Sequence, residues 1–212
     1  MSQPCNRGAD VPLPGKLDPG LKEFWVTNPF QIASAGQNLS AFERKRMFLN
    51  VKGEAFVDIS HLSGADNDGD GRSVVAADFR NTGMLDLVVR QAGGGPLLLY
   101  DNRSPPKSYL SVSLRGHQSN RQGIGARLTA EVGGRTIIRE LFPANGYRSQ
   151  APNQLHFGLG DDQKIDTLTV RWPSGKVQVL KDVPAARHIV VDEDKEGAEA
   201  VETVVPGRRI AP

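Results

Sequence analysis

The sequence predicts an all-β fold in which an antiparallel β-sandwich follows a smaller β subdomain. Between Phe24 and Val191 nearly every apolar run is four to seven residues long, alternates or is β-branched, and ends at Gly, Pro, Asn or Asp, as strands do. Turn signals separate these runs at the spacing typical of sandwiches and barrels. Helical segments of ten or more residues, which parallel α/β folds place between strands, are missing from the pattern.

The elements are expected in a simple order along the chain. Residues 1–20 carry four prolines and several glycines, which favours an extended arm over a core. The β subdomain is expected over residues 21–103, the sandwich over 104–194 and a charged tail over 195–212. The best helical stretch, SAFERKRMF, fits a turn before a strand equally well. The expected strands are, in order, FWVT, MFLNV, SVVAAD, LDLVV, LLLYD, YLSVSLR, ARLTAEV, TIIRELF, QLHFGLG, DTLTVRW, KVQVL and HIVVDE.

Composition limits the classes of partner. The chain has 212 residues, 38% of them apolar, and a formal net charge of +2, so nucleic acid is not expected as a main partner. The single cysteine, Cys5, has no partner for an intramolecular disulfide. No apolar run is long enough for a transmembrane segment, and the first thirty residues lack the apolar core of a secretory signal. The sequence is therefore expected to be cytoplasmic or a processed form.

Four motifs occur in order between Tyr109 and Glu193: SNRQGIGAR, NGYRSQ, LHFGLG and WPSG. Together they make this segment closely resemble the ASPIC/UnbV domain, which implies a β-sandwich. Trp172, next to Pro173 at the end of a predicted strand, is expected to close one end of that sandwich.

The upstream segments over residues 38–60 and 66–89 resemble one unit of the FG-GAP/VCBS repeats found in cartilage-acidic-protein-like proteins. Those relatives carry several such units in a β-propeller, but this chain has room for about one. A lone propeller-type repeat leaves sheet faces uncovered, so its strands are expected to pack on the sandwich or on a partner. The resemblance implies an extracytoplasmic module, periplasmic, secreted or on the cell surface, that binds calcium.

The first acidic turn has the spacing of a calcium loop. Asp66, Asp68 and Asp70 stand at positions one, three and five, and Gly71 at six allows the sharp bend. Acids are missing at positions nine and twelve, so Asp78 would have to complete the site. Weak calcium binding is expected, and the competing explanation is that these acids only solvate a turn.

The second turn, DFRNTGMLD, aligns with the repeat through Asp78, Gly83 and Asp86, but Arg80 replaces an acid. Its guanidinium is expected to pair with Asp78 or Asp86 and to substitute for the metal.

Polar residues near the glycine turns of the ASPIC/UnbV-like segment are candidates for binding a carbohydrate, a carboxylate or a partner's backbone. The alternative is that they buttress the loops. The candidates are Asn120, Arg121, Arg127, Asn145, Tyr147, Arg148, Ser149 and Gln150.

Catalysis is not expected. The four histidines show no paired ligand spacing, and His156 alternates with apolar neighbours as a structural strand residue does. The sequence therefore predicts a non-catalytic binding or assembly module, an accessory subunit with a protein partner. The alternative is a hydrolase or tailoring enzyme with a loop site over Asn145–Gln150.

Overall fold

The computed structural model describes residues 15–21, 44–51, 53–69, 71–91, 96–144, 146–147 and 149–201. These residues form thirteen strands, one α-helix, α1 (Ser60–Ser63), and one 3-10 helix, η1 (Pro19–Leu21). The prediction of an all-β fold is confirmed. The predicted strand FWVT and most of the predicted N-terminal arm lie outside the described residues, and no helix of the described part is long and apolar enough to cross a membrane.

The chain divides into two compact units. The first takes its described residues from Met1–Gly71 and Gln91–Pro96, and the second from Arg72–Arg90 and Leu97–Pro212. The sandwich belongs to the second unit, and the hairpin of β1 (Phe48–Val51) and β2 (Ala55–Asp58) belongs to the first.

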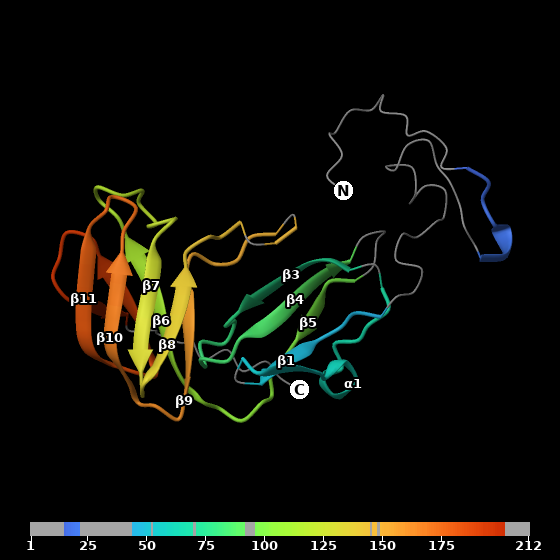
Figure 1. Ribbon diagram of the computed structural model, residues 1–212, viewed down its shortest axis with the longest axis horizontal. Coiled ribbons are helices and arrows are strands. Elements are labelled where there is room, and N and C mark those ends of the chain that lie inside the picture. The colour runs from blue at the N-terminus through green and yellow to red at the C-terminus, as the bar shows by residue number, and fades with distance from the viewer. Residues whose placement is uncertain are drawn as a thin grey trace. The chain divides into compact units, whose positions relative to one another are not determined.

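One sheet of the sandwich has the order β11-β10-β7-β8, with every neighbouring pair antiparallel (Figure 1). Its strands are β7 (Arg127–Val132), β8 (Arg135–Glu140), β10 (Lys164–Arg171) and β11 (Val177–Pro184). Residues alternate between a buried and an outward face in β7 and, from Thr167 onward, in β10, as a half-buried strand requires. This is the alternation that the sequence pattern predicted.

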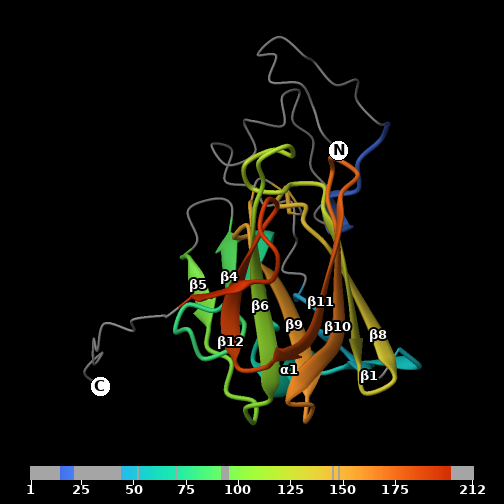
Figure 2. The ribbon, with the colours of Figure 1, turned by 90° about the vertical axis from the view of Figure 1, so that its left-hand side faces the viewer.

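The other sheet has the order β13-β12-β6-β9, and Figure 2 shows β12 and β6 side by side. Its strands are β6 (Ser108–Arg115), β9 (Leu155–Gly160), β12 (Arg187–Asp192) and β13 (Glu199–Val201). The pair β6–β12 is parallel, which is a departure from the purely antiparallel sandwich expected. The sequence also missed β13, which pairs with β12 at the start of the predicted tail.

The core lies between these two sheets. Its fully buried members come from the inward faces of both, among them Leu110, Leu128, Phe157 and Leu168. Trp172 is buried at 2% exposure and donates from Nε1 to Gln178 Oε1 at 2.5 Å. The predicted burial of this tryptophan is confirmed.

Gly123 shows why the SNRQGIGAR turn needs glycine. It has a φ of +67°, and an added Cβ would lie 2.8 Å from the Leu114 side chain and 3.2 Å from the Trp172 ring. The turn can therefore pack directly against Leu114 and Trp172 only because residue 123 has no side chain.

A three-stranded sheet of order β3-β4-β5 completes the described strands. It consists of β3 (Gly71–Ala77), β4 (Asp86–Gln91) and β5 (Leu98–Tyr100). The segment 44–47, within the stretch considered for a helix, is not helical and leads into β1, as a turn before a strand would.

Candidate functional site

Side chains from the segment before β1 hold the first acidic turn. The Asp66 carboxylate accepts a hydrogen bond from Arg44 Nη1 at 2.8 Å and lies 3.3 Å from His61 Nδ1. Asp68 is exposed, and Asp70 lies outside the described residues. Asp66, one of the predicted calcium ligands, is thus already paired with a side-chain cation.

Lys45 binds the same turn. Its Nζ donates to the Asn67 carbonyl at 3.1 Å, to Asn67 Oδ1 at 3.0 Å and to the Gly69 carbonyl at 2.7 Å. An ammonium group has three hydrogens, and three oxygens accept them here. Sequence reasoning missed this contact, because the residues that meet are 22 positions apart and no local pattern links them.

Asp78 closes the turn that follows β3. Its carboxylate accepts backbone hydrogen bonds from Arg80 at 3.3 Å, Thr82 at 3.0 Å and Gly83 at 2.6 Å. Gly83 has a φ of +82°, and a Cβ there would lie 2.0 Å from the Tyr109 ring. Asp78, the fourth predicted calcium ligand, therefore has its oxygens engaged within its own turn.

Arg80 supplies the positive charge of the second turn. Its Nη2 lies 3.2 Å from Asp86 Oδ1 and 2.6 Å from Asp101 Oδ1, and it donates to the Asn102 carbonyl at 3.3 Å. Asp86 is buried and also accepts from the Asn102 backbone N–H at 2.9 Å. The prediction that this guanidinium pairs with Asp86 is confirmed.

A buried carboxylate organises the turn between β6 and β7. Glu193 Oε2 accepts from the backbone N–H groups of His117, Gln118 and Ser119 at 2.6, 2.9 and 2.8 Å. Its Oε1 accepts from the hydroxyls of Ser119 at 2.8 Å and Ser174 at 2.6 Å. Sequence reasoning did not single out Glu193, because a lone acid after a strand carries no signal of burial.

These contacts set the ionisation of Glu193. Burial of the carboxylate would by itself raise its pKa, but the hydrogen bonds, led by that from the Ser174 hydroxyl, outweigh burial and lower the pKa from 4.5 to about 2. Glu193 therefore stays charged at neutral pH and fixes the turn in place.

The polar candidates of this turn differ in their contacts. Asn120 Nδ2 donates to the Ile124 carbonyl at 2.7 Å, and its Oδ1 accepts from the Ile124 N–H at 2.8 Å. The Arg121 carbonyl accepts from the Gly116 N–H at 3.0 Å, while its side chain is exposed. Arg127 forms an exposed ion pair with Glu140 at 3.6 Å. The local hydrogen bonds favour buttressing over ligand binding for Asn120.

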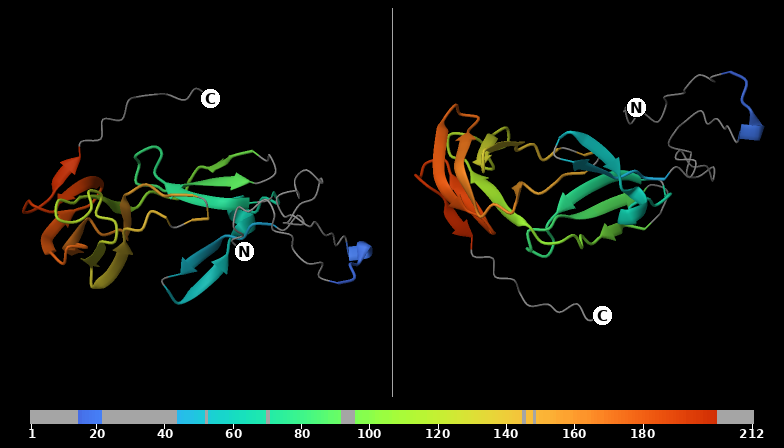
Figure 3. Two further views of the ribbon diagram at one scale, coloured as in Figure 1. Left: turned by 90° about the horizontal axis from the view of Figure 1, so that it is seen from above. Right: turned by 60° about the horizontal axis from the view of Figure 1, so that its bottom comes forward.

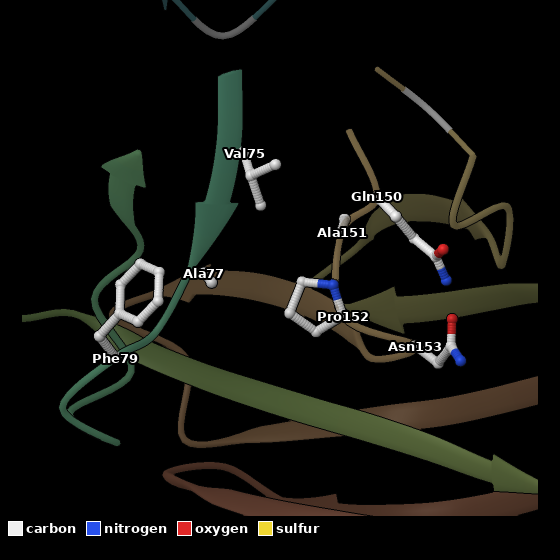
Figure 4. A pocket seen from close by; sticks show the side chains of 7 residues that line it. All are labelled: Val75, Ala77, Phe79, Gln150, Ala151, Pro152 and Asn153. Atoms are coloured by element: carbon white, nitrogen blue, oxygen red, sulfur yellow. The ribbon is translucent and has the colours of Figure 1, made fainter. Parts of the chain in front are cut away.

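A pocket of about 430 Å³ lies beside the other candidate loop (Figure 4). Gln150 is on its wall, Tyr147 is exposed, and Asn145 and Arg148 lie outside the described residues. Ser149 Oγ is buried and has no hydrogen-bond partner within the described part of the chain. A nucleophilic serine needs a base within hydrogen-bond reach, and none contacts this hydroxyl. The pocket is lined by Val75, Ala77, Phe79, Gln150, Ala151, Pro152 and Asn153.

Two histidines share one face of the second sheet, which the sequence did not reveal. Both His156 on β9 and His188 on β12 stand in register with Ser111 on β6. His156 stacks on Tyr109 with ring centroids 5.7 Å apart, and His188 Nε2 hydrogen-bonds Ser113 Oγ at 2.8 Å. Burial lowers the pKa of each histidine. Both act as packed strand residues here.

The β1–β2 hairpin leaves its apolar side chains in solvent, and it is the cyan pair of strands in Figure 3. The register pairs Leu49 with Val57 and Val51 with Ala55, so these four residues share one wholly apolar face. The opposite face carries Phe48, Asn50, Phe56 and Asp58. All eight positions are exposed.

A family model matches part of the chain. The family model described as ASPIC and UnbV matches residues 116–198, and none of the curated proteins compared matches the chain. The matched segment contains β7 to β12 together with Trp172 and Glu193. The upstream resemblance to FG-GAP/VCBS repeats and to cartilage-acidic-protein-like proteins lies outside this match and stays a prediction. Residues 116–198 are thus similar to the ASPIC and UnbV family, and they form most of the observed sandwich.

Proposed function

We propose that this chain is a non-catalytic assembly module that docks onto a protein partner through the β1–β2 hairpin. The main support is that the sandwich buries its apolar residues, whereas the described part of the chain before it leaves most of them partly or fully exposed. The sandwich closes around a continuous core, whereas Val89 is the only buried large apolar residue among the described residues before position 104. A sheet stable in water needs one face covered, and within the part of the chain that the structure describes both faces of the hairpin are exposed.

The exposed apolar area has the size of a docking surface. Six large apolar side chains of the first unit are between 39% and 89% exposed: Phe48, Leu49, Val51, Phe56, Val57 and Leu62. With roughly 150–200 Å² for each whole residue, they leave on the order of 600 Å² of apolar surface. This area is divided between the two faces of the hairpin and Leu62 on α1, whereas a standard interface buries about 800 Å² per partner, so a partner that covers most of it has to enclose the hairpin.

The shape of this surface favours a protein as the occupant. Small ligands bind in concave sites, but the hairpin is a two-stranded ribbon with apolar side chains on both faces. A ribbon with apolar side chains on both faces can insert between two apolar elements of a partner. Phe48 and Phe56, both on the mixed face, are aromatic residues, a class that is enriched in protein interfaces.

The non-catalytic part of the proposal is supported by the site geometry. Ser149, in the loop considered for a hydrolase, has no base on its hydroxyl among the described residues, and the His156 ring is stacked on Tyr109. Carbohydrate binding at the loop that carries Gln150 stays a prediction. An extracytoplasmic location is proposed as well, on the resemblance alone.

The test uses paired substitutions on two exposed strands. Leu49→Asp with Val57→Asp places two charges on the apolar face of the hairpin. Val177→Asp with Val179→Asp is the matched control, because these valines are 49% and 55% exposed on β11 of the sandwich. Tagged chains are purified from the native host, and complex size is measured by size-exclusion chromatography with light scattering. Hydrogen exchange of β1 and β2 is compared between complex and free chain.

The proposal expects a complex that the hairpin pair abolishes and the β11 pair retains, with slowed exchange of β1 and β2 in the complex. A complex that survives the hairpin pair contradicts it, and so does equal exchange in both states. If the chain self-associates more at higher concentration, and Leu49→Asp with Val57→Asp abolishes this, the partner is a second copy of the chain and not another protein.

A further inference from the structure

Two adjacent cations face the oxygen atoms of the first acidic turn. Arg44 Nη1 reaches the Asp66 carboxylate at 2.8 Å and the Asp66 carbonyl at 3.4 Å. Lys45 Nζ reaches the Asn67 carbonyl, Asn67 Oδ1 and the Gly69 carbonyl at 3.1, 3.0 and 2.7 Å. Five contacts to the oxygens of this turn thus come from guanidinium and ammonium groups.

The backbone around Lys45 fixes this arrangement. The Lys45 N–H donates to the Asn67 carbonyl at 3.1 Å, which sets the lysine directly against the turn. A Cβ on Gly71 would lie 2.4 Å from Lys45 Cε, so the glycine at position six leaves room for the lysine stem. In addition, Asn67 Oδ1 accepts the Gly69 N–H at 2.8 Å, which holds the turn closed around the ammonium.

The described residues do not fit calcium in this turn. Calcium takes six to eight oxygen ligands at about 2.3–2.6 Å, and the oxygens offered here already bind a covalently attached cation. Asp66 is engaged by Arg44, and Asp68 is exposed. A calcium ion would have to displace both side chains against their own electrostatic attraction to the turn.

We propose that Lys45, assisted by Arg44, is a built-in counter-cation that takes the place of calcium in the turn at residues 66–69. The second turn follows the same design with Arg80 between Asp86 and Asp101. Both turns then keep the bend of a cation-binding loop without depending on a free ion. Calcium becomes able to bind the first turn only when Lys45 is removed.

The experiment begins with the unmodified chain, so that it does not depend on how a variant folds. A limiting acylating reagent labels lysines according to the availability of their amines, and peptide mass spectrometry reads each site. Lys45 is expected to react several-fold more slowly than Lys16, an exposed lysine of the same unit. Addition of about 5 mM calcium, several-fold above the weakest dissociation constants of protein calcium sites, is expected to leave the Lys45 rate unchanged.

The second arm compares Lys45→Met with Lys16→Met as the matched control. Each change removes one positive charge and keeps an unbranched side chain of similar length. Lys45→Met is expected to lower Tm by about 5 °C, because three charge-assisted hydrogen bonds are lost. Calcium is expected to raise the Tm of Lys45→Met, and EDTA to reverse that rise, while the unmodified chain and Lys16→Met respond to neither.

Faster acylation of Lys45 on adding calcium would overturn the proposal, since the ion would then have expelled the ammonium. Calorimetric heat from calcium and the unmodified chain, unchanged in Lys45→Met, would overturn it as well. If Lys45→Met has the Tm of the unmodified chain and no calcium response, Lys45 is a bystander and the proposal is wrong. None of these results bears on docking through the hairpin, so the proposed function is tested separately.

Discussion

Replacing Glu193 by Gln probes the main polar support of the sandwich. The carboxylate has 0% exposure and accepts five hydrogen bonds, three of them from backbone N–H groups. Gln keeps the shape, and one amide oxygen can still face the three N–H groups, while the amide nitrogen faces hydroxyls that can rotate to accept. Glu193→Gln therefore removes the negative charge, and with it the added strength that a charged acceptor gives to each of these hydrogen bonds.

The magnitude follows from the ionisation of Glu193. A fall of its pKa from 4.5 to about 2 corresponds to about 3 kcal/mol of folding free energy at neutral pH. Because the folded-state pKa lies below the unfolded one, this stabilisation is complete above about pH 5 and is lost as the pH falls toward 2. About 2 kcal/mol should already be missing at pH 3.

Urea denaturation of the native chain and Glu193→Gln, each at pH 7 and pH 3, measures this directly. Both proteins carry Trp25→Phe, because the chain has a second tryptophan at position 25; the remaining fluorescence, that of Trp172, then reports the unfolding of the sandwich. Glu193→Gln should be less stable by about 3 kcal/mol at pH 7, and the gap should shrink to about 1 kcal/mol at pH 3. Other groups titrate in both proteins, so the difference between them isolates Glu193. An equal gap at both pH values would refute the reasoning, because it would show a packing effect independent of charge.

Three further outcomes test other parts of the fold. Trp172→Ala should cost about 3–5 kcal/mol in denaturant unfolding, because it empties the core end of the sandwich; an unchanged midpoint would contradict this. Gly123→Ala should cost more than 1 kcal/mol, since it combines a positive φ with a Cβ 2.8 Å from Leu114, and a stability equal to the native chain would show that the turn relaxes freely. Arg80→Met should lower stability by about 1–3 kcal/mol because buried Asp86 loses its counter-charge, and calcium should not restore it in a thermal melt. Restoration by calcium would mean that the second turn is a metal site.

Local sequence patterns were enough to predict most strands of the fold. The alternation of apolar and polar residues with period two is a property of each strand's own sequence. The runs from LDLVV to HIVVDE could therefore be assigned as strands without knowing which strands they pair with. The motifs from SNRQGIGAR to WPSG likewise indicated the family that residues 116–198 match. Trp172 could be assigned to the core because a large aromatic residue at the end of a strand, next to a turn, commonly packs over the end of a β-sandwich. The short strands β2 and β13 were missed, since Ala55–Asp58 and Glu199–Val201 are too short to show a period.

The sites depended on contacts that no local pattern contains. Glu193 meets the His117 N–H across 76 positions, and Lys45 meets Asn67 across 22. The acidic spacing of Asp66 and Asp68 predicted weak calcium binding, which stays a prediction, and no local pattern indicated that side-chain cations would reach this turn. Only the folded chain brings Arg44 and Lys45 to the turn. The sequence by itself determined the longer strands of the sandwich and the motifs of the family match, because those depend on neighbouring residues. The tertiary structure decided which charges meet, because Coulomb attraction and burial act between side chains that only folding brings together.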